Sequence, residues 1–221
     1  MSAFSVIIPS RDPGNIVACV AALEKHEAVD RPHIIVVDDG AKTIETARAL
    51  RGVTWATGIK PFIFSRNINI GIQLAGRHDV VLLNDDALLK TRLGFTTLSQ
   101  ACDANPKIGI IGATTNITGQ PLQKPRGIGL RAVEHFAFVA VYIPRRTIDK
   151  VGMLDERYCL DYGVEDRDYC EAVRHAHLEV AVHDGCYVDH SQLMSSFRGG
   201  PTVPRSFAQN LQLFREKWGY V

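Results

Sequence analysis

The N-terminal part of the chain follows a strand, helix, strand pattern, and this feature restricts the fold most. Residues 4–9 and 33–37 are short runs of β-forming side chains, and residues 15–26 between them place apolar side chains at helical spacing. Two strands joined through a helix lie parallel in a sheet, because the helix crosses over one face. The sequence therefore predicts an α/β fold built on a mostly parallel sheet.

Similar patterns predict the remaining elements. Helices are expected at residues 43–51, 69–76, 93–104, 145–151, 166–177 and 206–218. Strands are expected at residues 53–56, 61–64, 80–83, 108–111, 136–143, 179–182 and 187–188. Glycines and prolines between residues 109 and 130 predict a loop-rich stretch. Apolar side chains at spacings of three or four predict a stripe that docks the last helix on the domain: Phe207, Leu211, Phe214 and Trp218.

Composition favours a single globular unit. With 221 residues, of which 46% are hydrophobic and 22% charged, the chain can bury one sizeable core. The formal net charge is +1 and no long block of like charge occurs, so no extended nucleic-acid-binding patch is expected. No apolar stretch reaches membrane-spanning length and no basic segment precedes the first apolar run, so we expect a cytoplasmic protein. Five scattered cysteines without a Cys-x-x-Cys spacing predict reduced thiols.

Polar clusters follow four of the predicted strands. They are Pro9-Ser10-Arg11, Asp38-Asp39-Gly40, Asn84-Asp85-Asp86 and Asp189-His190. In an open α/β sheet the carboxyl ends of parallel strands share one edge, where ligands bind. We therefore expect residues that are far apart in the sequence to share a crevice.

The adjacent carboxylates Asp85 and Asp86 are the strongest chemical signal. Paired acids at a strand end suit a hard divalent cation, which commonly enters a site together with phosphates. The alternative interpretation is a solvated turn, because Asn and Asp also start turns. A carboxylate at Asp38 or Asp39 could accept a hydrogen bond from a base N–H or a ribose hydroxyl. The chain has no Gly-x-Gly-x-x-Gly motif and no Gly-Lys-Ser/Thr loop, which argues against a dinucleotide dehydrogenase or a P-loop enzyme.

An ordered set of motifs resembles a known family. The segments VIIPS at residues 6–10, VVDDG at 36–40, RNINIGIQLA at 66–75 and LLNDDA at 82–87 are similar to family 2 glycosyltransferases of the GT-A fold. The segments LDERY at 154–158, GVEDRDYC at 163–170, VDH at 188–190 and FREKWG at 214–219 resemble the C-terminal half of the rhamnosyltransferase-like branch. The resemblance covers residues 4–219.

The resemblance implies a fold and an activity. The chain would form one GT-A domain, a mixed and mostly parallel sheet flanked by helices, with a nucleotide-binding half near residues 1–115 and an acceptor-binding half near 116–221. It would move a sugar, with inversion, from a nucleoside diphosphate sugar to an acceptor hydroxyl. The favoured donor is linked to UDP or dTDP. The default acceptor is a saccharide or a lipid-linked saccharide, and a hydroxylated nucleobase or a protein side chain stays open.

The resemblance also implies the donor-binding residues. Those that line the nucleoside site would be Pro9, Ser10, Arg11 and Asp39. Asp85 would lie beside the ribose and the metal, which is Mn²⁺ or Mg²⁺.

Metal binding is where the sequence departs from the family. Asp86 would be a metal ligand, and His190 would approach the metal or the diphosphate from the other half. Many members have Asp where this chain has Asn84. One acidic ligand is then left to hold the metal, together with the phosphates of the donor.

The acceptor half supplies the catalytic residues implied by the resemblance. Asp166 would be the general base that takes a proton from the acceptor hydroxyl. Glu165 could exchange roles with it, and a plain N-terminal capping acid is the alternative for Asp166. Arg198, which two glycines follow, would cover the diphosphate as part of a lid, or would be an exposed arginine.

Two other functions stay open at this point. A nucleotidyltransferase also uses an α/β nucleotide domain and a metal-binding acid, although residues 10–14 make a poor phosphate loop. A non-catalytic sugar-nucleotide-binding module is compatible with Asn84. The remaining histidines considered show no ligand spacing and are interpreted as surface or core residues: His135, His175, His177 and His183.

Overall fold

The computed structural model describes residues 4–27, 32–127, 129–158, 163–190 and 203–220. The strands in this part of the chain are β1 (Phe4–Ser10), β2 (His33–Asp38), β3 (Thr54–Thr57), β4 (Asp79–Leu83), β5 (Leu88–Leu89), β6 (Ile108–Thr115), β7 (Leu130–Ala132), β8 (Ala140–Ile143) and β9 (Glu179–Asp189). The helices are α1 (Pro13–His26), α2 (Ile44–Ala49), α3 (Phe64–Ala75), α4 (Gly94–Ala104), the 3₁₀ helix η1 (Pro121–Gln123), α5 (Arg145–Val151), α6 (Glu165–His175) and α7 (Val203–Trp218).

The described strands form one nine-stranded sheet in the order β3-β2-β1-β4-β8-β6-β9-β5, with β7 paired to β9. Strand β1 is parallel to β2 and β4, β2 is parallel to β3, and β6 is parallel to β9. Strand β8 is antiparallel to both β4 and β6, so these two run in the same direction. The short strands β5 and β7 are antiparallel to β9. The sheet is mixed and mostly parallel, which confirms the predicted fold class.

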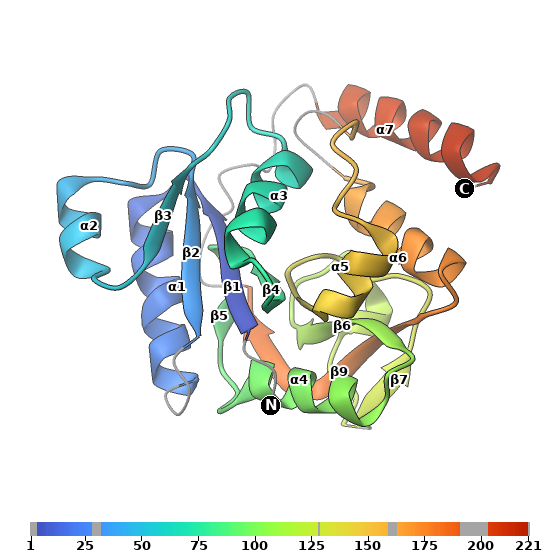
Figure 1. Cartoon of the computed structure of the whole chain (residues 1–221), viewed down its shortest axis with the longest axis horizontal. Helices are drawn as coiled ribbons and strands as arrows, with labels where there is room; N and C mark the ends of the chain where they lie inside the picture. Colours follow the sequence, from blue (N-terminus) through green and yellow to red (C-terminus); the bar gives the residue numbers. More distant parts are fainter. Residues whose placement is uncertain (1–3, 28–31, 128, 159–162, 191–202, 221) are drawn as a thin grey trace.

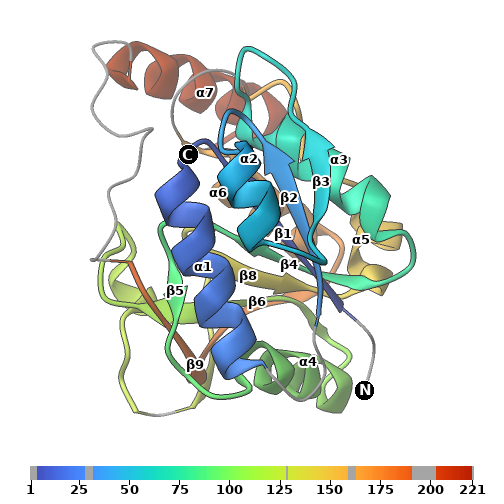
Figure 2. The ribbon, with the colours of Figure 1, turned by 90° about the vertical axis from the view of Figure 1, so that its left-hand side faces the viewer.

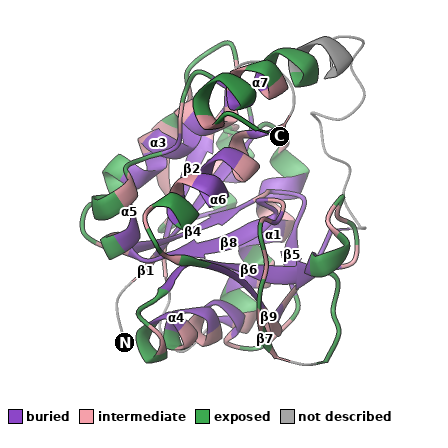
Figure 3. Ribbon diagram, turned by 90° about the vertical axis from the view of Figure 1, so that its right-hand side faces the viewer, coloured by how far each residue is buried: buried purple, intermediate pink, exposed green. Residues whose placement is uncertain are grey.

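Helices cover both faces of the sheet (Figures 1 and 2). In β1, Val6 and Ile8 belong to the apolar layer that contains side chains of α1 and α4, whereas Ile7 belongs to the layer that contains α3, α5 and α6. This alternation follows from strand geometry. Figure 3 shows the central strands as buried. Because both faces are covered, the central strands are apolar runs and their polar residues lie at the strand ends.

Helix α7 packs outside these two layers, next to α6 (Figures 1 and 3). Phe214 is fully buried and forms a small third cluster with Tyr158 and Val164, against which Trp218 packs. The predicted docking stripe is therefore confirmed for the C-terminal half of the helix. Its N-terminal half behaves differently, because Phe207 is 43% exposed.

Two strand predictions were wrong, and side-chain burial explains both. Residues 61–64 form no strand, because α3 begins at Phe64 and continues through the buried face of Ile68 and Ile72. That helix also begins earlier than the predicted 69–76. Residues 136–143 are a strand only in β8, and Phe136 and Phe138 are buried in the segment before it. An apolar run can be core without being extended.

Two features of the second half were resolved only in three dimensions. Residues 179–182 and 187–188 belong to the single strand β9, whose register against β6 shifts between Ala113 and Thr114. The predicted loop-rich stretch begins later than residue 109, because β6 extends to Thr115. Gly112 lies inside β6, where an added Cβ would lie 2.7 Å from the Phe136 ring. This glycine makes room for a buried ring and does not mark a turn.

The remaining composition-based expectations concern thiols and membrane spans. The four cysteines in the described residues are free thiols, in agreement with the prediction. None of the helices in this part of the chain combines the length and the apolar character that crossing a bilayer requires.

Candidate functional site

The four polar clusters meet at one edge of the sheet. Strands β1, β2, β4 and β9 run in the same direction, so their carboxyl ends lie on the same side. Side-chain hydrogen bonds join the clusters directly. Ser10 Oγ donates to Asp85 Oδ2 over 2.7 Å, and His190 Nε2 lies 2.9 Å from Asp86 Oδ1. The tertiary fold thus brings together side chains that are 75 and 104 positions apart.

A cavity of about 350 Å³ opens at this edge. Its polar lining from the strand ends is Asn84, Asp85, Asp86 and His190, and Pro9 lies beside them. Glu165 and Asp166, at the start of α6, line the same cavity. The volume lies in the range typical of small-molecule sites. Arg11 and Asp39 are outside this lining, at the neighbouring end of β1 and β2.

Asp85 is a buried carboxyl group beside a second one. Its exposed fraction is 6%, and burial raises its pKa to about 6, with the charge of Asp86 acting in the same direction. The hydrogen bond from Ser10 acts in the opposite direction and lowers the pKa. Two carboxylates in one water-poor site are costly unless a cation joins them.

His190 is oriented by its surroundings. Its Nδ1 lies 3.0 Å from the carbonyl oxygen of Ile117, which can only accept, so Nδ1 carries the proton. Its backbone N–H donates to Asn116 Oδ1, and Asn116 Nδ2 donates to Asp189 Oδ1. Nε2 is therefore the ring atom directed at Asp86, and the pair at 2.9 Å needs a proton on one partner. A divalent cation could take the place of that proton, because imidazole nitrogen and carboxylate oxygen are both metal ligands.

The donor set suits a metal that is held jointly with a ligand. Among the described residues, no group of three or more His, Cys, Asp or Glu side chains could hold a metal ion. Asp86 and His190 supply one oxygen and one nitrogen ligand, whereas a hard divalent cation takes six or more in total. Phosphate and water oxygens would complete the shell.

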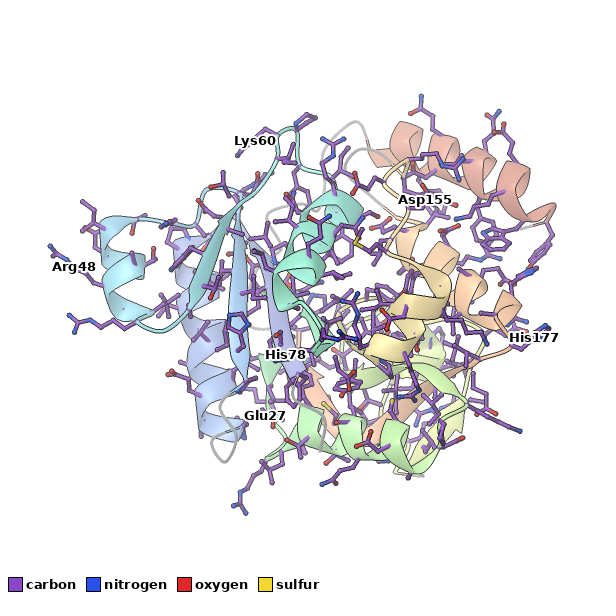
Figure 4. All side chains as sticks on the ribbon, viewed as in Figure 1. Glu27, Arg48, Lys60, His78, Asp155 and His177 are labelled. Atoms are coloured by element: carbon purple, nitrogen blue, oxygen red, sulfur yellow. The ribbon has the colours of Figure 1, made fainter. Side chains whose placement is uncertain are left out.

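Asp39 is held by two cations. Arg11 Nε donates to Asp39 Oδ2 over 3.1 Å, and Lys60 Nζ lies 3.0 Å from Oδ1 and donates to the backbone oxygen of Asp39 over 2.7 Å. Figure 4 shows Lys60 on the loop that follows β3. Sequence reasoning missed Lys60, which lies in no motif. Asp38, in contrast, accepts from the backbone N–H groups of Gly40 and Lys42, so its side chain closes the turn that follows β2.

Glu165 and Asp166 begin α6 and face the cavity. Burial raises the pKa of both carboxyl groups, and the charge of Asp166 raises that of Glu165 further. Asp166 Oδ1 also accepts from the backbone N–H of Arg167 over 2.7 Å, within the first turn of α6, whose N-cap residue is Val164. The preceding Val164 has φ +85°, a costly conformation for a β-branched residue. Tertiary packing therefore stabilises the backbone conformation at Val164 that orients Glu165 and Asp166.

Several lining residues were not predicted. They are Phe62, Phe64, Gln120, His135, Phe138, Val164, Arg167, Phe207 and Leu211. His135 lines the cavity although its position in the sequence suggested only a surface or core role. Most of the others are apolar and read as core residues from the sequence. Arg198 lies outside the described residues.

No protein-family model and no curated protein sequence matches the chain. Many solved structures resemble it, among them the following two. A crystal structure of GalNAc-T7 with UDP, GalNAc and Mn²⁺ has a TM-score of 0.75 and 11% identity over 96% of this chain and 48% of that chain. The mannosyltransferase PcManGT from Pyrobaculum calidifontis, in complex with GDP-Man and Mn²⁺, has a TM-score of 0.72 and 16% identity over 98% of this chain and 64% of that chain. The chain spans about half to two thirds of these proteins, and it has the GT-A fold that its motifs predicted.

Proposed function

We propose that this protein is a glycosyltransferase that moves a sugar from a nucleoside diphosphate sugar to an acceptor hydroxyl, with inversion at the anomeric carbon. One observation carries the proposal. A single cavity joins Asp86 and His190, which suit a metal and a diphosphate, to Glu165 and Asp166, which suit proton abstraction. The order of the motifs supports a place in family 2, in the rhamnosyltransferase-like branch.

The nucleotide half would bind the donor. Asp39 would accept a hydrogen bond from the base, with Arg11 and Lys60 holding its carboxylate, and Pro9 and Ser10 would line the nucleoside site. A base with an N–H between two carbonyl groups suits one carboxylate, so we favour UDP- or dTDP-linked donors. The two similar structures contain UDP with GalNAc and GDP-Man, and both contain Mn²⁺, which supports a nucleotide sugar and Mn²⁺ here, with Mg²⁺ as the alternative.

Asp86 and His190 would hold the metal, with Asp85 beside it. A bound divalent cation would stabilise the negative charge of the departing diphosphate. Asn84 leaves Asp86 as the acidic ligand from its cluster, so the donor's own phosphates would complete the binding. Arg198 would add a second positive charge over the diphosphate.

Asp166 would take the proton of the acceptor hydroxyl. The acceptor oxygen then forms a bond to the anomeric carbon while the bond to the phosphate oxygen breaks, and its electron pair leaves with the diphosphate. Displacement from the opposite face inverts the centre. A raised pKa suits this role, because a base works best when its pKa lies near the operating pH. The acceptor hydroxyl is proposed to belong to a saccharide; a hydroxylated nucleobase or a protein side chain is the alternative.

Incubating the protein with a panel of sugar nucleotides tests the proposal. With Mn²⁺ and without acceptor, we expect slow release of free sugar and nucleoside diphosphate from one donor class. EDTA and Asp86→Ala should abolish this release. Asp149→Asn is the matched control, because its side chain is 62% exposed on α5, and it should behave like the parent.

Two results would contradict the proposal. Pyrophosphate release from a nucleoside triphosphate would identify a nucleotidyltransferase. Tight, metal-dependent donor binding with no hydrolysis and no transfer to any acceptor would identify a binding module.

A further inference from the structure

His190 lies just beyond the paired part of its strand. The backbone pairing of β6 with β9 ends at Thr115 and Val188, two residues before His190. The pairing of these two strands therefore does not itself hold the residue that is directed at Asp86. The position of His190 depends on other groups at the ends of the two strands.

The side chain of Asn116, the residue after β6, continues this pairing. Its Oδ1 accepts from the backbone N–H of His190 over 2.9 Å, and its Nδ2 donates to Asp189 Oδ1 over 2.9 Å. A backbone N–H can only donate and a carboxylate oxygen accepts, so both ends of the amide are matched in one orientation. One side chain thus ties the end of β6 to two consecutive residues at the end of β9.

The residue after Asn116 holds the imidazole ring. The carbonyl oxygen of Ile117 lies 3.0 Å from His190 Nδ1, and the backbone N–H of Ile117 donates to Asn116 Oδ1 over 3.1 Å. The same amide oxygen therefore orders the backbone of His190 and the segment that carries the acceptor for its ring. With Nδ1 bound in this way, Nε2 faces Asp86 at 2.9 Å. Asn116 does not line the cavity, so it would act on a bound ligand through His190.

We propose that Asn116 is a positioning residue for the metal site, which keeps His190 Nε2 directed at a cation shared with Asp86. This role rests on the proposed function and adds to it a residue that contacts neither donor nor acceptor. A histidine that binds a metal is usually oriented through its surroundings, and loss of such a partner weakens metal affinity by roughly 10- to 100-fold. The effect should be marked here, because Asp86 and His190 are the two proposed protein ligands.

Mn²⁺ binding in the presence of UDP tests the proposal. Electron paramagnetic resonance measures unbound Mn²⁺ directly, so the assay requires no turnover. Asn116→Ala should weaken Mn²⁺ affinity by roughly ten-fold or more, while UDP affinity in EDTA, measured by calorimetry, should stay at the parental value. In a His190→Ala background the same substitution should cause no further loss, because Asn116 acts through that side chain.

Asn105→Ala is the matched control. Asn105, just before β6, donates from Nδ2 to Oε2 of Glu179, the first residue of β9, over 3.4 Å. The same kind of amide–carboxylate bond therefore joins these strands at the end away from the site. Its removal should leave Mn²⁺ affinity unchanged.

An exchange of the two side chains gives a second test. Asn116→Asp alone places two carboxylates against each other and should weaken Mn²⁺ binding. Combined with Asp189→Asn, it restores one amide and one carboxylate. The amide at position 189 can then donate to the carboxylate at position 116, which still accepts from the backbone N–H of His190. This double variant should recover most of the lost affinity at unchanged net charge.

Parental Mn²⁺ affinity in folded Asn116→Ala, with melting temperature as the check, would overturn the proposal. An equal loss in Asn105→Ala would also overturn it, because any loosening of β6 and β9 would then weaken the site. So would a further loss in the His190→Ala background, or a double variant that binds no better than Asn116→Asp. These results leave the metal dependence of the parent intact, whereas a parent that binds no Mn²⁺ with UDP would contradict the proposed function itself, and this proposal with it.

Discussion

At the residue scale, two pairs of neighbouring residues place carboxyl groups side by side at the site. Asp85 and Asp86 are 6% and 3% exposed and adjacent, and Glu165 and Asp166 are adjacent at the start of α6. The two carboxylates of each pair would repel each other if both were ionised. Proteins retain such arrangements mainly where a ligand or a reaction uses them, so these residues carry the sharpest predictions.

The first prediction concerns Asp166. Asp166→Asn keeps the shape of the side chain but cannot take a proton, so turnover should fall by roughly 10² to 10⁴, the scale of general-base catalysis. Donor affinity measured by calorimetry should stay near the parental value, and Glu165→Gln should have a smaller effect. Parental turnover in Asp166→Asn would move the base elsewhere, with Glu165 as the next candidate.

The second prediction contrasts the two donor-site acids. Asp86→Asn should remove the part of UDP and dTDP affinity that depends on Mn²⁺, because the proposed metal ligand is lost. Asp39→Asn should weaken binding by a similar factor with and without Mn²⁺, because this acid is assigned to the nucleoside. Calorimetry with both nucleotides distinguishes the two variants. If Asp39→Asn removed only the Mn²⁺-dependent part of the affinity, the roles of Asp39 and Asp86 would have to be exchanged.

The third prediction follows from the pKa of Asp85, which burial raises from its ordinary value of 3.8 to about 6. Between these pH values the unfolded chain has lost the proton that the folded protein still binds, so this group lowers stability as pH rises. Asp85→Asn removes that penalty. Relative to the parent, its free energy of unfolding should increase by ~2 kcal/mol between pH 4 and pH 7.5. Urea titrations of both proteins test this, and a constant difference across the range would refute it.

At the scale of elements, α7 supports α6, the helix that carries the proposed catalytic acids Glu165 and Asp166. Asp168 on α6 is 2% exposed and accepts from Tyr158 Oη, Lys217 Nζ and Trp218 Nε1, each over 2.8 Å. Figure 4 shows Asp155, which also pairs with Lys217, on the segment next to α7. Helices α6 and α7 and the segment that contains Asp155 are therefore held together by contacts around the buried carboxylate of Asp168.

The fourth prediction tests that unit. Phe214 packs on Val164, whose backbone has a positive φ and directly precedes Glu165. The centre of the Phe214 ring lies 4.8 Å from the guanidinium carbon of Arg167. Phe214→Ala should lower the free energy of unfolding by about 3–5 kcal/mol. It should also lower the rate of sugar transfer by a larger factor than the affinity for the donor. Gln212→Ala, exposed on the same helix, is the control. A loss below about 1 kcal/mol would show that α7 is only loosely attached.

At the scale of the whole molecule, the site lies between two groups of parallel strands. Asp86 follows β4 and His190 follows β9, and the antiparallel strand β8 joins the two groups. A metal and a diphosphate bound between Asp86 and His190 would therefore link both groups of strands. Ligand binding should act on the stability of the whole domain.

The fifth prediction concerns this linkage. UDP at about 100 times its Kd, with Mn²⁺, should stabilise the folded protein by about 2.7 kcal/mol, which corresponds to roughly 5–10 °C in melting temperature for a domain of this size. Differential scanning calorimetry measures the shift. UDP with EDTA should give a smaller shift, and Asp86→Asn should respond equally to UDP with and without Mn²⁺. An identical shift for the parent with and without metal would argue against a shared metal site.

The sequence by itself determined the features that depend on local patterns. Apolar runs and helical spacing predicted the parallel core around β1, β2 and β4, and polar residues directly after strands predicted which side chains would share an edge. These predictions succeed because strand direction carries every carboxyl end of a parallel group to the same side. The motif order added the GT-A fold, which the solved structures confirm.

Only the tertiary structure decided which residues surround the cavity. Phe138 and Phe207 look like core residues in the sequence, and Lys60 and His135 lie in no motif, yet packing places these side chains at or beside the site. The raised pKa of Asp85 likewise depends on burial by segments distant in the sequence. Local patterns record whether a side chain is apolar or charged. Whether it then faces a core, a cavity or a partner depends on how the strands and helices pack, because that packing sets the distances between residues far apart in the chain.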